Sequence, residues 1–331
     1  MVTLWLVLTL AMVAVGLGTY LSTETRLMRL RLARAQAQAW ARAGVYLGLE
    51  RLASDKEASD WLGERWAFAP QLVDQFGPWT IALPPEGDRG AAFSGRVSVT
   101  ITDEDRRLNV NRLEDPNLWR VVEALGGGAE LADLLADYLD ADEQARPRGL
   151  ETQDAPAWYH AKNAPIVVLE ELQQIPGLTD EHRALLQQYA SPFLQTISTI
   201  NLNTADLSLL QAICMVAGAP TLAEQIVAYR WDPEDGVGPE GGNHFVQLRP
   251  EVQTSGAPLD PGLKDALARV MTGPWGAWLG VQSSTFRIAV TTEITAPQTR
   301  VHLVAVVRRA AQTASLQTGG VSFHILFWQE A

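Results

Sequence analysis

The chain has 331 residues, of which 47% are hydrophobic and 19% are charged, so it is globular and long enough for an anchor plus one or two domains. Its formal net charge of −12 argues against a protein that binds duplex DNA or an anionic membrane, because such proteins usually show a basic face. The single cysteine, Cys214, excludes an intrachain disulfide, and its apolar setting LLQAICMVAGA predicts a buried structural thiol.

The N-terminal segment predicts a membrane anchor. Residues 2–23 contain no charged residue, and about 20 apolar residues suffice to cross a bilayer as a helix. Trp5 and Tyr20 lie near the two ends of this run, where amphipathic rings favour the membrane interface. A signal peptide would need a basic segment before the run, and none precedes it here. The stretch RLMRLRLARAQAQAWARAGVYLGLERL follows with no turn residue before Gly44, which predicts one long helix to about Ser54.

The orientation of this anchor stays open at the level of sequence. Four arginines follow the apolar run, and the positive-inside rule would hold the remainder of the chain in the cytoplasm. A long C-terminal domain can override this local charge, and so can basic residues upstream of the run. The four residues are Arg26, Arg29, Arg31 and Arg34.

Strand patterns occur at both ends of the remaining chain. Residues 78–84 and 95–104 read as short strands bounded by Pro, Gly and Asp. Three more runs near the C-terminus predict an antiparallel meander, at residues 286–294, 300–309 and 321–328. A long helix packed on a sheet that is built from both chain ends is an α+β layer.

Residues 109–272 form a helix-rich block with an internal repeat. NVNRLEDPNLWRVVEALGGGAELADLLADYLDAD begins at Asn109, and NLNTADLSLLQAICMVAGAPTLAEQIVAYRWDPED begins at Asn201. Each reads as Asn-apolar-Asn, an amphipathic helix, a glycine-containing turn and a second helix, followed by a further helical segment. Thr204 is a plausible N-cap. We interpret the block as a duplicated all-α unit inserted between the two halves of the α+β domain.

The repeat resembles the helix-hairpin-helix modules of competence-type DNA-binding proteins, which hold phosphate with backbone N–H groups and nearby basic residues. Both hairpins here, ALGGGAEL and VAGAPTLA, lack a basic residue and lead into acidic sequence, which disfavours DNA. Residues 236–242, GVGPEGG, have the spacing of a dinucleotide-binding loop but follow WDPED instead of a strand, so we expect an ordinary loop. The five histidines share no metal-binding spacing, and we expect no enzyme.

The loop after the first hairpin is strongly acidic. From Glu130 to Asp154 the chain has eight Asp/Glu against two Arg, a local charge of −6. Asp140, Asp142 and Glu151 fall at positions 1, 3 and 12 of an EF-hand-like spacing, although position 6 is Ala instead of the glycine that an EF-hand turn needs. Either this is a solvated loop or its carboxylates converge on a hard cation, which prefers oxygen ligands.

In their order along the chain these segments resemble one family, the K-type minor pseudopilins of the bacterial type II secretion system. The resemblance is carried by VTLWLVLTLAMVAV, RLARAQAQAWARAGVYLGLERL, ITDEDRRLNVN, DYLDADEQARPRGLE, YHAKNAPIVVLEELQQIPGLT, INLNTADLSLL, FRIAVTTEI and VHLVAVVRR. It implies an α+β fold of the type IV pilin kind, with a large helical insertion. On that basis the chain divides into a transmembrane part (1–23), its periplasmic continuation (24–55), the first part of the sheet (56–108), the insertion (109–272) and the C-terminal strands (273–331).

The resemblance also implies a role. It predicts a subunit of the bacterial inner membrane, anchored through residues 2–21 with its C-terminal domain in the periplasm, that caps the tip of a short filament exporting folded proteins. The implied partners are I-type and J-type pseudopilins, the pseudopilus and the inner-membrane platform, with no nucleic acid; a competence-like, membrane-anchored DNA-binding protein is the alternative. Family members carry a short basic leader before the apolar run, and K-type members lack the N-terminal glutamate of other pilins. Here the first acid is Glu24.

Finally, the resemblance implies calcium. K-type pseudopilins bind it through acids in the region that reads DxxDxD…GxE. The corresponding positions in this chain are Asp137, Asp140, Asp142 and Glu151, with Asp154 as a further candidate.

Overall fold

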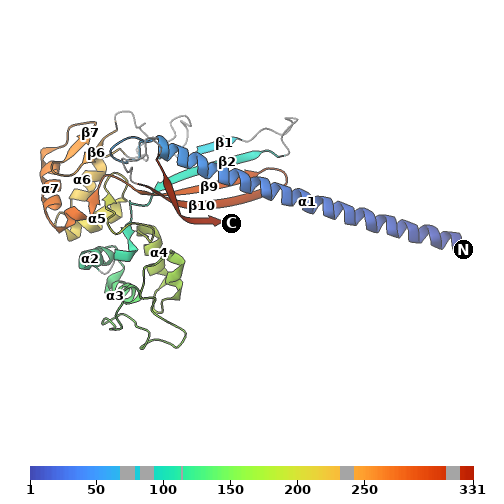
Figure 1. Ribbon diagram of the computed structural model, residues 1–331, viewed down its shortest axis with the longest axis horizontal. Coiled ribbons are helices and arrows are strands. Elements are labelled where there is room, and N and C mark those ends of the chain that lie inside the picture. The colour runs from blue at the N-terminus through green and yellow to red at the C-terminus, as the bar shows by residue number, and fades with distance from the viewer. Residues whose placement is uncertain (68–78, 83–92, 113–114, 232–241, 311–320) are drawn as a thin grey trace.

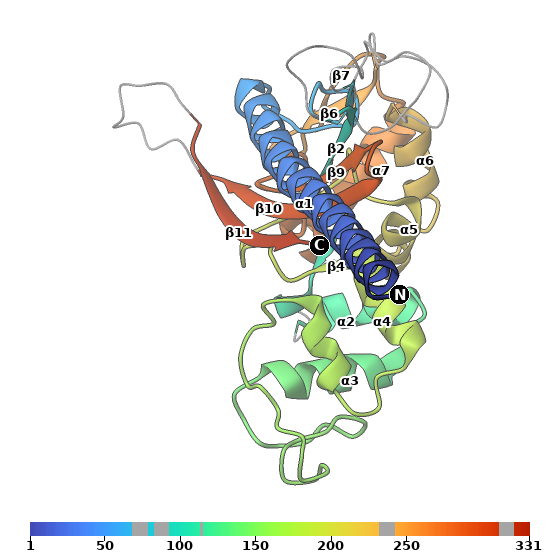
Figure 2. The same cartoon turned by 90° about the vertical axis from the view of Figure 1, so that its right-hand side faces the viewer.

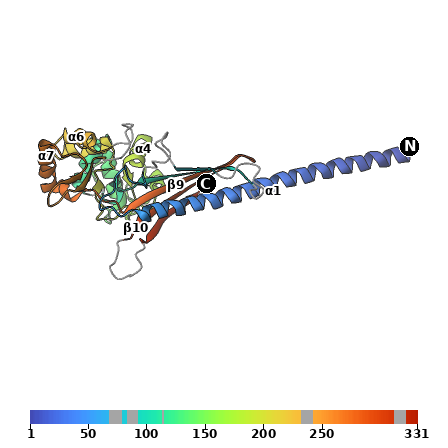
Figure 3. The same cartoon turned by 90° about the horizontal axis from the view of Figure 1, so that it is seen from above.

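Figure 1 shows the computed structural model, which describes residues 1–67, 79–82, 93–112, 115–231, 242–310 and 321–331. Helix α1, Val2–Ser54, is continuous over 53 residues, so the expected long helix is confirmed. Its N-terminal half projects away from the rest of the molecule (Figures 1 and 3). Within the described part of the chain it is the one helix long and apolar enough to cross a membrane, and its most apolar stretch is not buried.

The C-terminal half of α1 packs closely on the sheet through small side chains. Ala33, Ala37 and Ala41 are fully buried there. A Cβ atom added to Gly44 would lie 2.7 Å from a methyl group of Val290, which shows how near the helix backbone comes to the strand below it. Small residues in this stripe therefore set the distance between the helix and the sheet.

The sheet has five strands in the order β1-β2-β9-β10-β11, and every neighbouring pair is antiparallel. Helix α1 covers one face of it (Figure 2). The strands expected at 95–104, 286–294, 300–309 and 321–328 are confirmed to within two residues at each end, whereas the ends of the strand expected at 78–84 lie outside the described residues. The bounds are β1 Trp79–Ala82, β2 Gly95–Asp103, β9 Thr285–Ile294, β10 Thr299–Arg309 and β11 Phe323–Glu330.

Between β2 and β9 the chain builds two helical units, each closed by a two-residue parallel strand pair. The first unit comprises β3 Leu108–Asn109, η1 Val110–Arg112, α2 Pro116–Ala124, α3 Gly128–Leu139, η2 Leu169–Gln174, α4 Asp180–Tyr189 and β4 Ala190–Ser191. The second comprises β5 Ile200–Asn201, α5 Leu207–Val216, α6 Leu222–Tyr229, β6 His244–Gln247, β7 Gln253–Ser255, α7 Pro261–Thr272, η4 Pro274–Ala277 and β8 Leu279–Gly280. Strand β3 pairs with β4 and β5 with β8, so both units have the same closure.

Each unit contains an equivalent asparagine that fixes a distant segment of the same unit. In the first, the side chain of Asn111 accepts from the backbone N–H of Ile166 at 2.7 Å and donates to its carbonyl at 3.0 Å. In the second, Asn203 makes the same pair of bonds to Phe245, both at 2.8 Å. Each asparagine thus acts as a clamp that fixes a distant segment onto the strand end. The internal duplication expected from the sequence is present in the hydrogen bonding as well as in the element order.

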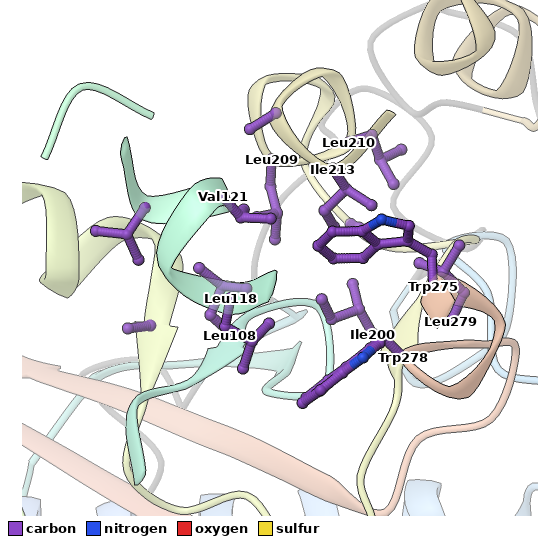
Figure 4. Close-up of a cluster of buried hydrophobic side chains, with 14 of the residues drawn as sticks. Leu108, Leu118, Val121, Ile200, Leu209, Leu210, Ile213, Trp275, Trp278 and Leu279 are labelled. Carbon is purple, nitrogen blue, oxygen red and sulfur yellow. The ribbon is translucent and has the colours of Figure 1, made fainter. Parts of the chain in front are cut away.

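The units also share one hydrophobic core, seen in Figure 4. Side chains of β3 and α2 meet those of β5, α5 and η4 in a single cluster around Leu118, Ile200, Ile213 and Trp275. A separate cluster lies between α1 and the sheet. The described residues therefore form two hydrophobic cores, one between the N-terminal helix and the sheet and one inside the insertion.

One expectation about local structure is wrong in detail. Thr204 does not cap a helix: α5 is capped by Asp206, and the Thr204 hydroxyl donates to Asp103 at 2.5 Å. This happens because Thr204 is buried at the entry to the insertion, where a carboxylate is available. In the second unit Phe245 lies in strand β6, where its backbone N–H and carbonyl bond to the side chain of Asn203. The loop expected at 236–242 lies outside the described residues except for Gly242.

Candidate functional site

The acidic loop leaves the first unit at the end of α3 and returns to it before η2. Helix α3 buries Asp137 on its last turn and stops at Asp140, where the backbone becomes extended. The returning chain is fixed by a hydrogen bond from the N–H of Asn163 to the carbonyl of Tyr138 at 3.0 Å. The loop thus begins and ends on the same helix end, which brings acids far apart in sequence near one another.

Arg146 is the internal counter-ion of this loop. Its Nη1 donates to Asp137 at 2.7 Å and to Asp140 at 2.5 Å, and its backbone N–H donates to Asp137 at 3.0 Å. The guanidinium also lies over the ring of Trp119, 5.4 Å from its centroid. One arginine therefore satisfies Asp137 and one oxygen of Asp140 without reaching the remaining acids.

Asp140, Asp142 and Glu151 form a three-carboxylate cluster. Each offers one oxygen, and these three oxygens lie within 4.8 Å of one another. Glu151 is fully buried, yet neither of its carboxylate oxygens has a hydrogen-bond partner among the described residues, and the same holds for Oδ1 of Asp140. Such unpaired buried oxygens are costly unless something positive meets them.

The electrostatics of Glu151 reflect this position. Burial, together with the neighbouring charges of Asp137 and Asp140, raises the pKa of its carboxyl to about 7. The protein matrix alone therefore favours the protonated form of Glu151 up to neutral pH. A cation in the cluster would reverse this preference, because it stabilises the carboxylate.

Gly149 is a member of the site that the sequence did not single out. A Cβ atom at this position would lie 1.8 Å from Oδ2 of Asp137, so any larger residue must displace a buried carboxylate. The only sequence signal was the glycine in the family's GxE pattern, which marks a place where the backbone passes close to another group. Asp133, which is buried and accepts from the N–H of Arg148 at 3.2 Å, was also not anticipated.

Of the five expected ligands the structure brings three together. Asp140, Asp142 and Glu151 form the cluster. Asp137 lies beside them, with its oxygens occupied by Arg146. Asp154 is exposed and lies outside the group, although its N–H bonds to the carbonyl of Glu151 at 3.2 Å. As metal ligands, all five residues stay predictions.

The cluster fits a hard divalent cation. Its donors are all carboxylate oxygens, and calcium takes oxygen ligands at about 2.3–2.6 Å, so two ligands on opposite sides of one ion are about 5 Å apart. The three oxygens lie within 4.8 Å of one another, so a single ion could contact all of them. The unpaired oxygens of Glu151 point to the same conclusion.

A second carboxylate cluster joins α1 to the sheet and has a different character. Asp55 and Asp60 both pair with Nη2 of Arg309, at 3.0 and 3.2 Å. The two oxygens of Glu64 accept from the N–H of Trp61 and from the indole of Trp66. Arg309 offsets part of the negative charge of this cluster, and burial raises the pKa of Glu64 to about 10, which favours its protonated form at neutral pH. We assign the cluster a structural role where the insertion, α1 and the sheet meet.

Comparison with known proteins supports this picture. Residues 106–192 match the family model for protein K of the type II secretion system, a range that coincides with the first helical unit and its acidic loop. The fold is shared with a chain in the crystal structure of the GspK–GspI–GspJ complex from the type 2 secretion system of enterotoxigenic Escherichia coli. The TM-score is 0.60 at 19% sequence identity, and the match covers 92% of this chain and 99% of that one. No curated protein sequence matches the chain.

The resemblance seen in the sequence is therefore confirmed on two independent grounds. The family model matches the first unit, and the solved structure shares the fold. The structural match accounts for nearly the whole length of both chains.

Proposed function

We propose that this chain, whose first helical unit matches protein K of type II secretion and whose fold recurs in the GspK–GspI–GspJ complex, is the K-type minor pseudopilin of a bacterial type II secretion system. It is a structural component of the export machinery and not an enzyme. It is held in the inner membrane by the apolar part of α1, with the sheet and the insertion in the periplasm.

The observation that carries the tip role is the placement of the insertion. It lies at the end of the molecule opposite the projecting half of α1 (Figure 1). A filament of pilin-like subunits is built around N-terminal helices, so a subunit enters below its predecessors. A slim helix with a broad head at its far end fits the first subunit, because no other subunit could stack beyond the head.

Deleting residues 109–272 and rejoining the strands tests the cap. We expect filaments that are longer or lose their regulated length when this shortened chain replaces the full one in a secreting cell. Electron microscopy of sheared filaments measures the length distribution. An unchanged length and number of filaments would contradict the cap.

The proposed partners are the I-type and J-type pseudopilins, because the solved relative is a complex of GspK with GspI and GspJ. Co-expression with the I-type and J-type proteins encoded beside this chain should give a stoichiometric complex on size exclusion. Failure of the three to co-purify, while I and J bind each other, would remove this chain from the tip.

We further propose that the three-carboxylate cluster holds calcium, with Asp140, Asp142 and Glu151 as its acidic ligands. The support is the set of buried, unpaired oxygens described above. The ion would fix the loop against α3. Stabilisation by a ligand that binds only the folded state follows RT ln(1 + [L]/Kd), or about 2.7 kcal/mol at a hundredfold excess over Kd.

Thermal unfolding with chelator and with added calcium tests this site. We expect chelator to lower the Tm and calcium to restore it better than magnesium, because magnesium demands a tighter octahedral site. Asp140→Ala combined with Glu151→Ala should abolish the difference. Glu143→Ala is the matched control, since Glu143 is an exposed acid of the same loop and lies outside the cluster. Identical unfolding curves in chelator and calcium would return the loop to a solvated role.

The competence-like alternative gains no support from the hairpins. The turns between α2 and α3 and between α5 and α6 carry Gly, Ala, Pro and Thr but no basic residue, and the first leads into the acidic loop. Salt-dependent binding of DNA by the full chain would be required to revive it.

A further inference from the structure

The face of α1 that packs on the sheet changes from buried alanines to exposed arginines where the sheet ends, on the N-terminal side. The buried stripe runs upward from Ala33 through Ala37 and Ala41. With 3.6 residues per turn, the positions that continue this stripe toward the membrane are Arg29 and Arg26. Both arginines are exposed, and among the described residues neither has an ion-pair partner. Two guanidinium groups thus point to the side where the sheet has ended.

A groove opens at this place, between α1 and the turn that joins β9 to β10. Its volume is about 1100 Å³, slightly above the roughly 300–1,000 Å³ of pockets that hold small organic ligands. One part of its lining is polar and the other apolar. The lining residues are Ser22, Thr25, Arg26, Arg29, Leu30, Leu32, Phe93, Ala296, Pro297 and Gln298.

The groove lies at the level of the headgroup layer when the apolar run of α1 spans a bilayer. The uncharged run ends at Thr23, and a helix rises 1.5 Å per residue, so Arg26 and Arg29 lie about 4.5 and 9 Å beyond it. The headgroup layer on each side of the hydrocarbon core is roughly 5–7 Å thick. Long arginine side chains can bend back toward the phosphates from the outer of these positions.

The local charge runs against the charge of the whole protein. From Ser22 to Arg34 the helix has four arginines and one glutamate, a net of +3, in a chain whose total is −12. The acidity of the whole chain argued against contact with an anionic membrane. This basic segment, residues 22–34, is an exception to that acidity. The positive-inside rule makes such residues unusual on the exported side, so a use for them there is expected.

We infer that the groove between α1 and the β9–β10 turn binds the phosphate of an anionic phospholipid, with Arg26 and Arg29 as its ligands. Guanidinium groups bind phosphate through paired charged hydrogen bonds, and the apolar part of the lining suits the glycerol and upper acyl region. The contact docks the lower end of the sheet on the membrane surface before the subunit is drawn into the filament. This inference relies on the membrane anchor proposed above, but not on the tip role or on calcium.

The full chain, reconstituted in vesicles, tests the docking. A fluorophore is attached at Thr295→Cys, in the same turn but outside the lining of the groove. Burial raises the pKa of the native Cys214 thiol to about 12, so labelling is selective for the new cysteine. A trace of lipid with a nitroxide on its headgroup quenches the fluorophore when the turn lies on the membrane. Vesicles are phosphatidylcholine alone or an equal mixture with phosphatidylglycerol.

We expect stronger quenching in the anionic vesicles and its loss in Arg26→Gln/Arg29→Gln. Each arginine near an anionic surface should change the docking equilibrium by roughly fivefold, so the pair changes it by about 25-fold. Arg31→Gln/Arg34→Gln is the matched control, since it removes the same charge from other faces of the same helix and should retain most of the quenching. Added salt should weaken docking in the parent chain.

Other outcomes are equally decisive. Equal quenching in both vesicle types, or equal loss in both double variants, overturns the groove as a lipid site. Competition by millimolar inorganic phosphate in solution would show a general anion site and overturn the assignment to a lipid. A requirement for the I-type protein before quenching appears would show that a neighbouring helix fills the groove. Failure of the chain to float with the vesicles overturns the anchor itself, and with it this inference.

Discussion

The two helical units of the insertion have the same frame but differ in what they place on it. Both begin with a two-residue strand that pairs with the strand ending the unit, cap their first helix with an aspartate and clamp a distant segment with an asparagine. After the second helix they diverge. The first unit runs into the acidic loop with its three-carboxylate cluster, whereas the described part of the second continues into the hairpin of β6 and β7.

This difference separates scaffold from function. The residues common to both units, Asn111 and Asn203 or Asp115 and Asp206, satisfy backbone groups and belong to folding. The residues present only in the first unit, Arg146, Gly149 and Glu151, belong to the loop. The family match to residues 106–192 covers the unit with the loop.

The asparagine clamps should show the largest effects. Asn203→Ala removes two bonds to the backbone of Phe245 in a fully buried position, and each buried partner left unpaired costs about 1–3 kcal/mol. We expect a loss of about 3–5 kcal/mol in the free energy of unfolding, against about 2–4 for the half-buried Asn111→Ala. Chemical denaturation measures both. Asn117→Ala is the control, because the Asn117 side chain makes no hydrogen bond among the described residues. Equal losses of stability at all three positions would contradict the clamp.

The second-largest difference between the two units should appear in the pH dependence of stability. With chelator present, the raised pKa of Glu151 means that the folded state holds its proton more tightly than the unfolded state, where the pKa is near 4.5. Stability from this group is full below about pH 4.5 and is lost as the pH rises through about 7. Glu151→Gln should remove that loss.

Glu224→Gln in the second unit is the comparison, because a hydrogen bond from Gln211 lowers the pKa of Glu224. Removing the Glu224 carboxylate should change the slope of stability against pH in the direction opposite to that of Glu151→Gln. Acids at the junction, such as Glu64, have raised pKa values in every variant, so only differences between variants are interpreted. Parallel profiles of stability against pH for Glu151→Gln and the parent chain would contradict a raised pKa of Glu151 in the folded state.

Gly149→Ala tests the close approach in the loop. The new methyl group would collide with the buried carboxylate of Asp137, and overpacking of this kind costs about 1–3 kcal/mol. Gly273→Ala in the second unit is the control, since its Cβ would have no neighbour nearer than 3.5 Å. Thermal unfolding compares the two. A Gly149→Ala protein as stable as the control would mean that Asp137 can move freely.

The helix caps should give the smallest effects and equal ones. Asp115 caps α2 through the N–H of Asn117, and Asp206 caps α5 through the N–H of Ser208, both at 2.9 Å. Replacing either by Ala should cost about 1 kcal/mol. Unequal losses, measured by denaturation under the same conditions, would show that the two frames are not energetically equivalent.

Some features of this protein follow from local sequence alone. The apolar run and the alanine stripe determine α1, because helix length and a buried face are periodic properties of neighbouring residues. The alternating patterns determine the four longer strands, and the repeated Asn-apolar-Asn motif reveals the two units. The sequence also located Asp140, Asp142 and Glu151 as candidate ligands.

Other features required the tertiary structure, because they depend on residues far apart in the chain. The division of the loop acids, with Asp137 taken by Arg146 and Glu151 left unpaired, depends on how the loop folds back on α3. The sequence suggested Thr204 as a helix cap, but its hydroxyl instead donates a hydrogen bond to Asp103, about a hundred residues earlier in the chain. The groove between α1 and the β9–β10 turn likewise exists only because the sheet ends where the arginines begin. Charge and spacing are local, but which charge meets which partner is decided by the packing of the whole chain.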